Sequence, residues 1–190
     1  MKKATWISLY TLIDKEVVRI FRIWMQSLLP SVVTTSLYFL IFGAFIGQRI
    51  GEVEGVSYLE FVVPGLVMMA IITNSFSNVV SSFFGNKFQR SIEEVLVSPT
   101  PSWVIVAGYS IGGIVRGLLV GGLVLGLAFI FTGVFSSNIL AILAFAIFTS
   151  ILFSLAGLLN AIYAKKFDHV TIVPTFVLTP LTYLGGVFYS

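Results

Sequence analysis

The sequence predicts an all-α fold, a polytopic transmembrane helix bundle. Hydrophobic residues make up 57% of the 190 residues and charged residues only 10%, whereas a soluble globular chain carries about 25% charge. Apolar runs of roughly twenty residues, the length that crosses a bilayer, recur between short polar loops. We therefore expect one membrane domain over residues 1–190. With no cysteine and one histidine, the chain offers no disulfide, no thiol chemistry and no multi-histidine metal cluster.

Residues 5–26 predict an interfacial helix with one basic polar face and one aromatic apolar face. The polar stripe holds Ser8, Thr11, Lys15, Arg19, Arg22 and Gln26. The apolar stripe holds Trp6, Leu9, Ile13, Val17, Ile20, Phe21 and Trp24. Such a helix lies in the membrane plane, although an amphipathic helix of a soluble domain is the alternative. Because charges interrupt the segment, it is not a cleavable signal peptide.

Five apolar runs predict membrane spans at residues 28–47, 60–80, 104–133, 139–163 and 170–189. The third run exceeds one bilayer thickness, so we expect its first part to lie at the cytoplasmic surface or in a broken helix. Pro174 and Pro180 interrupt the fifth run, which predicts a kinked or broken helix.

Polar side chains inside the predicted spans need partners in another helix or in a wet cavity. Both interpretations stay open for the amides of the second span. The candidate residues of a substrate path are Thr34, Thr35, Asn74 and Asn78. Arg116 snorkels to the membrane edge if the third span begins near Gly112, which we favour, or faces a cavity or a partner if it begins at Trp103.

Glycines recur at four-residue spacing in the third span, and we expect Gly113, Gly117 and Gly121 to let another helix pack closely. These glycines do not form a phosphate loop, because the chain has no GxxxxGK[ST] motif. We therefore expect no nucleotide site within this chain.

A polar island, GNKFQRSIEEVLVSPTP at residues 85–101, separates the second and third spans. Apolar residues recur in it at helical spacing, at Phe88, Ile92, Val95 and Leu96, which predicts a short amphipathic helix. The charges of the island, Lys87 among them, mark it as solvated. A solvated surface helix without a partner is the alternative to a docking element.

Lysine and arginine residues are distributed unevenly between the two predicted sides. Nine lie in the N-terminal segment, the 85–101 island and the loop after the fourth span, whereas the opposite side has only Arg49. Since basic loops stay in the cytoplasm, we expect the N terminus and the island to be cytoplasmic.

Three stretches are similar to one family: EFVVPGLVMMAI at residues 60–71, IEEVLVSPTP at 92–101 and PLTYLGGVFYS at 180–190. Together with the order of the predicted elements, the chain resembles the ABC-2 type permease, the membrane subunit of bacterial ABC exporters. The resemblance covers essentially the whole chain.

This resemblance implies a subunit of the bacterial inner membrane that has six spans and pairs with a second copy in contact with membrane lipid. It implies a separate ATP-binding subunit that binds the cytoplasmic loop, and neither a cofactor nor nucleic acid. The coupling residues expected in that loop are Phe88, Arg90, Ile92, Glu93, Glu94, Leu96 and Pro99. A sixth span does not follow the fifth, so we expect the sequence to be part of a longer protein.

Two other classes of membrane protein fit this sequence less well. A secondary transporter or channel driven by an ion gradient usually places ionisable groups inside its spans, and Arg116 is the sole candidate here. A membrane-embedded enzyme needs converging polar groups, but the spans hold no histidine–carboxylate pairing. The transported substrate cannot be read from the sequence, although a lipid-like or amphipathic cargo fits spans with few charges.

Overall fold

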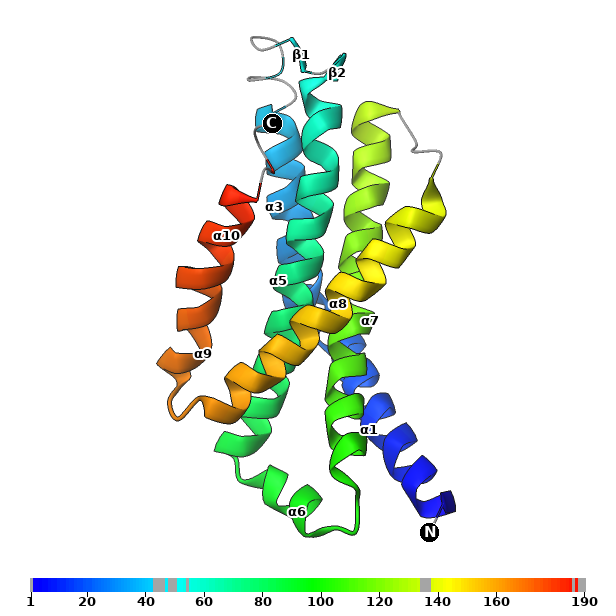
Figure 1. Cartoon of the computed structure of the whole chain (residues 1–190), viewed down its shortest axis with the longest axis vertical. Coiled ribbons are helices and arrows are strands. Elements are labelled where there is room, and N and C mark those ends of the chain that lie inside the picture. The colour runs from blue at the N-terminus through cyan, green and yellow to red at the C-terminus, as the bar shows by residue number, and fades with distance from the viewer. Residues whose placement is uncertain are drawn as a thin grey trace.

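The computed structural model describes residues 2–42, 47, 51–53, 55–133, 138–185 and 187. The helices α1 (Lys2–Arg22), α2 (Trp24–Ser27) and α3 (Leu29–Leu40) come first in the chain. A short ribbon of two strands, β1 (Glu52–Val53) and β2 (Val56–Ser57), follows them. The remaining elements are α5 (Tyr58–Phe88), α6 (Ser91–Val97), α7 (Ser102–Thr132), α8 (Ile139–Tyr163), α9 (Phe167–Val173), a π-helical segment (Pro174–Leu178) and α10 (Thr179–Leu184). Figure 1 shows a helix bundle with α6 at one end and the ribbon at the other. The predicted all-α fold is confirmed.

Within the described residues, three helices, α5, α7 and α8, are long and apolar enough to cross a membrane. A fourth span is added if α1 and the α2–α3 segment, which meet at a bend of 85°, count as one. Large apolar side chains cover the outside of the bundle, including Ile130 at 76% exposure, Leu140 at 84% and Phe148 at 72%. Such a surface suits lipid and not water.

The third predicted span differs from expectation in one respect. α7 is a single continuous helix from Ser102 to Thr132, so the broken-helix alternative is wrong, whereas a first part at the cytoplasmic surface stays a prediction. Where the membrane span begins along this helix stays a prediction, and so does the snorkelling interpretation of Arg116. Its guanidinium donates to the Ser27 carbonyl at 3.0 Å, so this charge faces a partner.

The run after α8 stays helical from Phe167 to Leu184, but its hydrogen bonding takes the π pattern between Pro174 and Leu178. This change of pattern begins at a proline, as expected for an interrupted helix. The ends of the predicted first and fifth spans, with residues 43–46 and 188–190, lie outside the described residues.

α5 is the central helix and packs against α7 and α8. Where α7 meets these neighbours, glycines leave no room for a side chain. A Cβ at Gly113 would lie 2.5 Å from Val79 Cγ2, and one at Gly121 would lie 2.6 Å from Ile71 Cγ1. A Cβ at Gly117 would collide with the Ser75 hydroxyl. The helices thus approach at the distance of backbone contact, which strengthens dispersion attraction in lipid.

α1 packs against α7 through the glycines Gly108 and Gly112, which lie against Leu12 and Glu16. The opposite side of α1 is exposed and carries Trp6 at 67% and Tyr10 at 72% exposure. The predicted division into a polar and an apolar stripe is therefore wrong in part. Arg19, from the polar stripe, points into the bundle, and Ile20, from the apolar stripe, is buried there.

Candidate functional site

The predicted coupling residues lie at the end of the bundle where α5 leads through α6 into α7 (Figure 1). α5 ends because Arg90 adopts a left-handed conformation, with φ of 61°, and its N–H bonds the Lys87 carbonyl at 3.2 Å. A residue other than glycine rarely adopts a positive φ. The chain changes direction at this residue. The short helix α6 then begins at Ser91.

Phe88 is not on α6, which corrects the prediction of one amphipathic helix that includes it. It is the last residue of α5, and its ring lies 4.7 Å from that of Phe167 and 6.3 Å from that of Phe84. Because the left-handed Arg90 separates the two helices, the spacing between Phe88 and Ile92 does not place them on one helical face.

α6 has one buried side and one exposed side. Ile92 is 6% exposed and belongs to an apolar cluster with Val79, Ile105, Tyr109 and Leu158. Glu93, Glu94, Leu96 and Val97 are exposed, as is Pro99 beyond the helix. Leu96 is 64% and Val97 88% exposed. The buried isoleucine therefore anchors a helix whose other side presents two carboxylates beside apolar side chains.

Polar contacts fix the base of α6 to its neighbours. The Ser91 hydroxyl donates to the Asn86 carbonyl at 3.2 Å, and the Asn86 amide donates to the Tyr109 hydroxyl of α7 at 2.8 Å. At the other end of α6, the Ser98 hydroxyl donates to the Val95 carbonyl at 2.6 Å. The Ser91 bond thus joins α6 to α5, and the Asn86 bond joins α5 to α7 directly beside α6.

Lys87 is not merely a solvated charge, as the sequence suggested. Its ammonium donates to the carbonyls of Ile162 at 2.6 Å, Ala164 at 2.8 Å and Ala161 at 3.4 Å. These carbonyls end α8, where the helix dipole favours a positive charge. Lys87 therefore fastens the end of α5 to the end of α8.

A groove of about 210 Å³ runs between α3 and α5. It contains three of the four predicted path residues, Thr34, Thr35 and Asn74. The Asn74 amide donates to the Ser31 hydroxyl at 3.1 Å and to the Ala70 carbonyl at 2.9 Å. Asn74 thus joins the two helices and lines the groove at the same time, so the two interpretations of this amide are not exclusive.

Asn78 lies one turn further along α5 but does not line this groove. Its side-chain oxygen accepts a hydrogen bond from Arg19 of α1 at 2.9 Å. The structure therefore separates Asn78 from the other three predicted path residues and gives it a role in helix packing.

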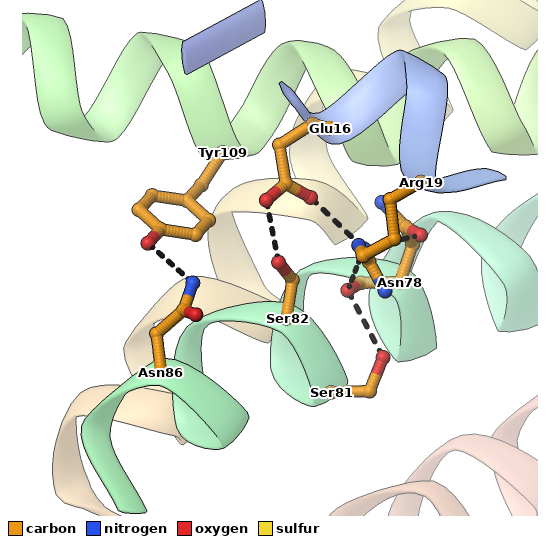
Figure 2. Close-up of polar contacts among 7 residues, drawn as sticks. All are labelled: Glu16, Arg19, Asn78, Ser81, Ser82, Asn86 and Tyr109. Atoms are coloured by element: carbon orange, nitrogen blue, oxygen red, sulfur yellow. Dashed lines mark hydrogen bonds and ion pairs between the residues drawn. The ribbon is translucent and has the colours of Figure 1, made fainter. Parts of the chain in front are cut away.

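Figure 2 shows the buried polar network to which Asn78 belongs. The carboxylate of Glu16, only 1% exposed, accepts from the Ser82 hydroxyl at 2.6 Å and from Arg19 at 2.9 Å. Burying a charge is unfavourable unless it is paired and hydrogen-bonded. Sequence reasoning missed Glu16 and Ser82, although the spacing of three between Glu16 and Arg19 places an acid beside a base on one helix.

A second groove, of about 450 Å³, lies between α5, α8 and α10 and is lined mainly by apolar side chains. No cluster of three or more histidine or carboxylate side chains occurs within the described ranges.

Comparison with known proteins decides the family. The model of the family "ABC-2 type transporter" matches residues 7–190. The chain belongs to the ABC-2 type transporter family. The resemblance read from the sequence is thereby confirmed, and this ABC-2 chain is a membrane permease of an ABC transporter.

The ABC-2 chain is 55% identical to the inner membrane transport permease YadH of Escherichia coli strain K12, over 100% of this chain and 74% of that protein. A protein of the same name from Shigella flexneri gives the same values. Nodulation protein J of Rhizobium leguminosarum bv. viciae is 25% identical over 87% of this chain and 64% of its own length. No solved structure matches the chain.

Proposed function

We propose that this chain is the permease subunit of an ABC exporter, and that the exposed side of α6 binds a separate ATP-binding subunit. The observation that carries the proposal is the orientation of α6. Ile92 is buried in the bundle while Leu96 and Val97 face outward beside Glu93 and Glu94. Exposed apolar side chains next to charges are typical of a surface that a soluble protein covers.

The fixation of α6 supports the same proposal. An ATP-binding subunit can move the spans only if the element it binds is firmly joined to them. α6 meets this condition through the buried Ile92 and through the bonds of Ser91 and Asn86 to α5 and α7. The resemblance stated above supplies the identity of the partner and the direction of transport.

We further propose that the α3–α5 groove belongs to the path of the cargo, and that two copies of the chain form the complete path. Thr34, Thr35 and Asn74 would supply hydroxyl and amide groups along it. The name of the Escherichia coli relative and the distribution of basic residues support an inner-membrane location with a cytoplasmic N terminus. Membership of the ABC-2 family removes support from the ion-gradient alternative.

Two substitutions test the α6 surface directly. The tagged chain is co-expressed with candidate ATP-binding subunits and purified in detergent, and the ATP hydrolysis of what it retains is measured. We expect Glu93→Lys and Leu96→Asp each to weaken binding at least about tenfold, because a hot-spot side chain contributes roughly 1–2 kcal/mol or more. Asp14→Lys, the same charge reversal on an exposed acid of α1, is the matched control. Full binding by both α6 variants would refute the proposal.

A further inference from the structure

The bend between α1 and the α2–α3 segment, which we call the elbow, is held by two arginine contacts. It has an angle of 85° and is centred on Ile23. Four residues before Ile23, Arg19 donates to the side chain of Asn78 on α5 at 2.9 Å. Four residues after it, the Ser27 carbonyl accepts from Arg116 on α7 at 3.0 Å. Each arm of the elbow is thus bonded to a different long helix.

The contact on the α1 side is a buried network. Glu16 is bonded both to Arg19 and to Ser82 of α5. Gly112 of α7 allows α1 to approach, since a Cβ there would lie 2.7 Å from Glu16 Cβ. Charges buried in an apolar bundle keep their partners, because separation leaves an unpaired charge. α1 is therefore constrained to follow α5 and α7.

The two helices that hold the elbow are the two that α6 joins. α5 ends at Phe88 and α7 begins at Ser102, and the bond from Asn86 to Tyr109 connects them directly beside α6. A displacement of α6 thus reaches both contacts of the elbow. Beyond the elbow lies α3, which carries Thr34 and Thr35 of the α3–α5 groove.

We infer that Arg19 and Arg116 are positioning residues that make the elbow, and with it α3, follow α5 and α7 when a bound ATP-binding subunit displaces α6. The inference rests on the proposed function of α6. It adds that the nucleotide state of the partner sets the position of α3 through these two contacts.

The test uses the absence of cysteine from the sequence. Spin labels are attached to Leu37→Cys on α3 and Leu152→Cys on α8, both exposed, and the labelled chain is diluted with unlabelled chain in nanodiscs. The distance between the labels is measured by electron paramagnetic resonance with the ATP-binding subunit bound, without nucleotide and after trapping with ATP and vanadate. We expect the distance distribution to shift between the two states.

Two sets of substitutions address the elbow. We expect Arg116→Gln, and Glu16→Gln together with Arg19→Gln, each to reduce that shift to less than half while binding of the ATP-binding subunit is unchanged. The double variant removes both charges together, so no unpaired ion remains buried. Arg116→Lys keeps a charged donor and should restore most of the shift. Arg22→Gln, on an exposed arginine of α1, should leave the shift complete.

Each outcome decides the matter. A complete shift in both sets of variants, or no shift in the chain with its native arginines, overturns the inference while binding at α6 stands. If the chain with native arginines retains no ATP-binding subunit, the proposed function fails first and the inference falls with it. Should Arg116→Gln fail to accumulate in membranes, the neutral double variant and Arg116→Lys provide the same decision.

Discussion

Replacing Gly113 with alanine adds one methyl group where α7 contacts both α5 and α8. The new Cβ would lie 2.5 Å from Val79 Cγ2 and from the Ser154 hydroxyl, and 2.8 Å from the Ser75 backbone oxygen. Side chains can adjust, but a backbone oxygen moves only with its helix. Because Ser75 and Val79 are fully buried, α5 and α7 must separate to admit the methyl group.

The expected cost follows from two opposing effects. Overpacking a close contact costs about 1–3 kcal/mol, and alanine regains up to about 1 kcal/mol through its higher helix propensity. Gly122 on the same helix is the matched control, since a Cβ placed there would meet no described atom within 4 Å apart from its chain neighbours and the nearby backbone of α7 itself. Gly122→Ala gains the stability that comes from the higher helix propensity of alanine, without the cost of overpacking. The two variants should differ by about 2 kcal/mol, or roughly 30-fold in the unfolding equilibrium.

Unfolding in mixed micelles of increasing SDS fraction, followed by far-ultraviolet circular dichroism, measures this difference. Gly113→Ala should unfold at a lower SDS fraction than the unsubstituted chain, and Gly122→Ala at the same fraction or a higher one. If both alanine variants unfold together, the packing explanation of these glycines is wrong.

Three further predictions concern the end of the bundle around α6. Lys87→Gln should reduce the stability of the C-terminal end of α8 by about 1 kcal/mol and so speed amide hydrogen exchange at Ala164. Lys165→Gln, which changes an exposed side chain, should leave this exchange rate unchanged. Arg90→Gly should raise the free energy of unfolding in SDS by up to about 1 kcal/mol, because glycine adopts a φ of 61° without steric strain. Unfolding of this variant at a lower SDS fraction than the unsubstituted chain would contradict the prediction. Ile92→Ala should lower the free energy of local unfolding of α6 by about 2–4 kcal/mol and so speed proteolysis within α6. An unchanged rate of cleavage would show that Ile92 does not anchor this helix.

The sequence predicted α8 with its observed bounds, Ile139–Tyr163, because polar turns flank one uniformly apolar run. α5 is helical well beyond the run of 60–80 expected to span the membrane, from Tyr58 to Phe88, whereas α7 at Ser102–Thr132 keeps close to its run of 104–133. Hydropathy reports contact with lipid, whereas the hydrogen-bond ladder of a helix continues as long as the backbone allows. The helix is therefore longer than the predicted span at α5.

The details of the site depended on contacts that are remote in sequence. Glu16 finds its α5 partner, Ser82, 66 residues away, so its burial could not be read from its own neighbours. Asn74 and Asn78 share a helical face by spacing, yet they bond to different helices, since the neighbour changes from α3 to α1 within one turn. The left-handed Arg90 has no sequence signal, because positive φ favours glycine.

The length of α5 and α7 has a mechanical consequence. A helix of 31 residues measures about 46 Å at 1.5 Å per residue, while the hydrocarbon core of a bilayer is about 30 Å thick. Each helix is thus a stiff rod longer than the layer it crosses. A rod that tilts about a pivot within the layer acts as a lever. A sideways shift of its α6 end therefore moves its far end in the opposite direction, and the hydrogen bonds within the helix stay unchanged.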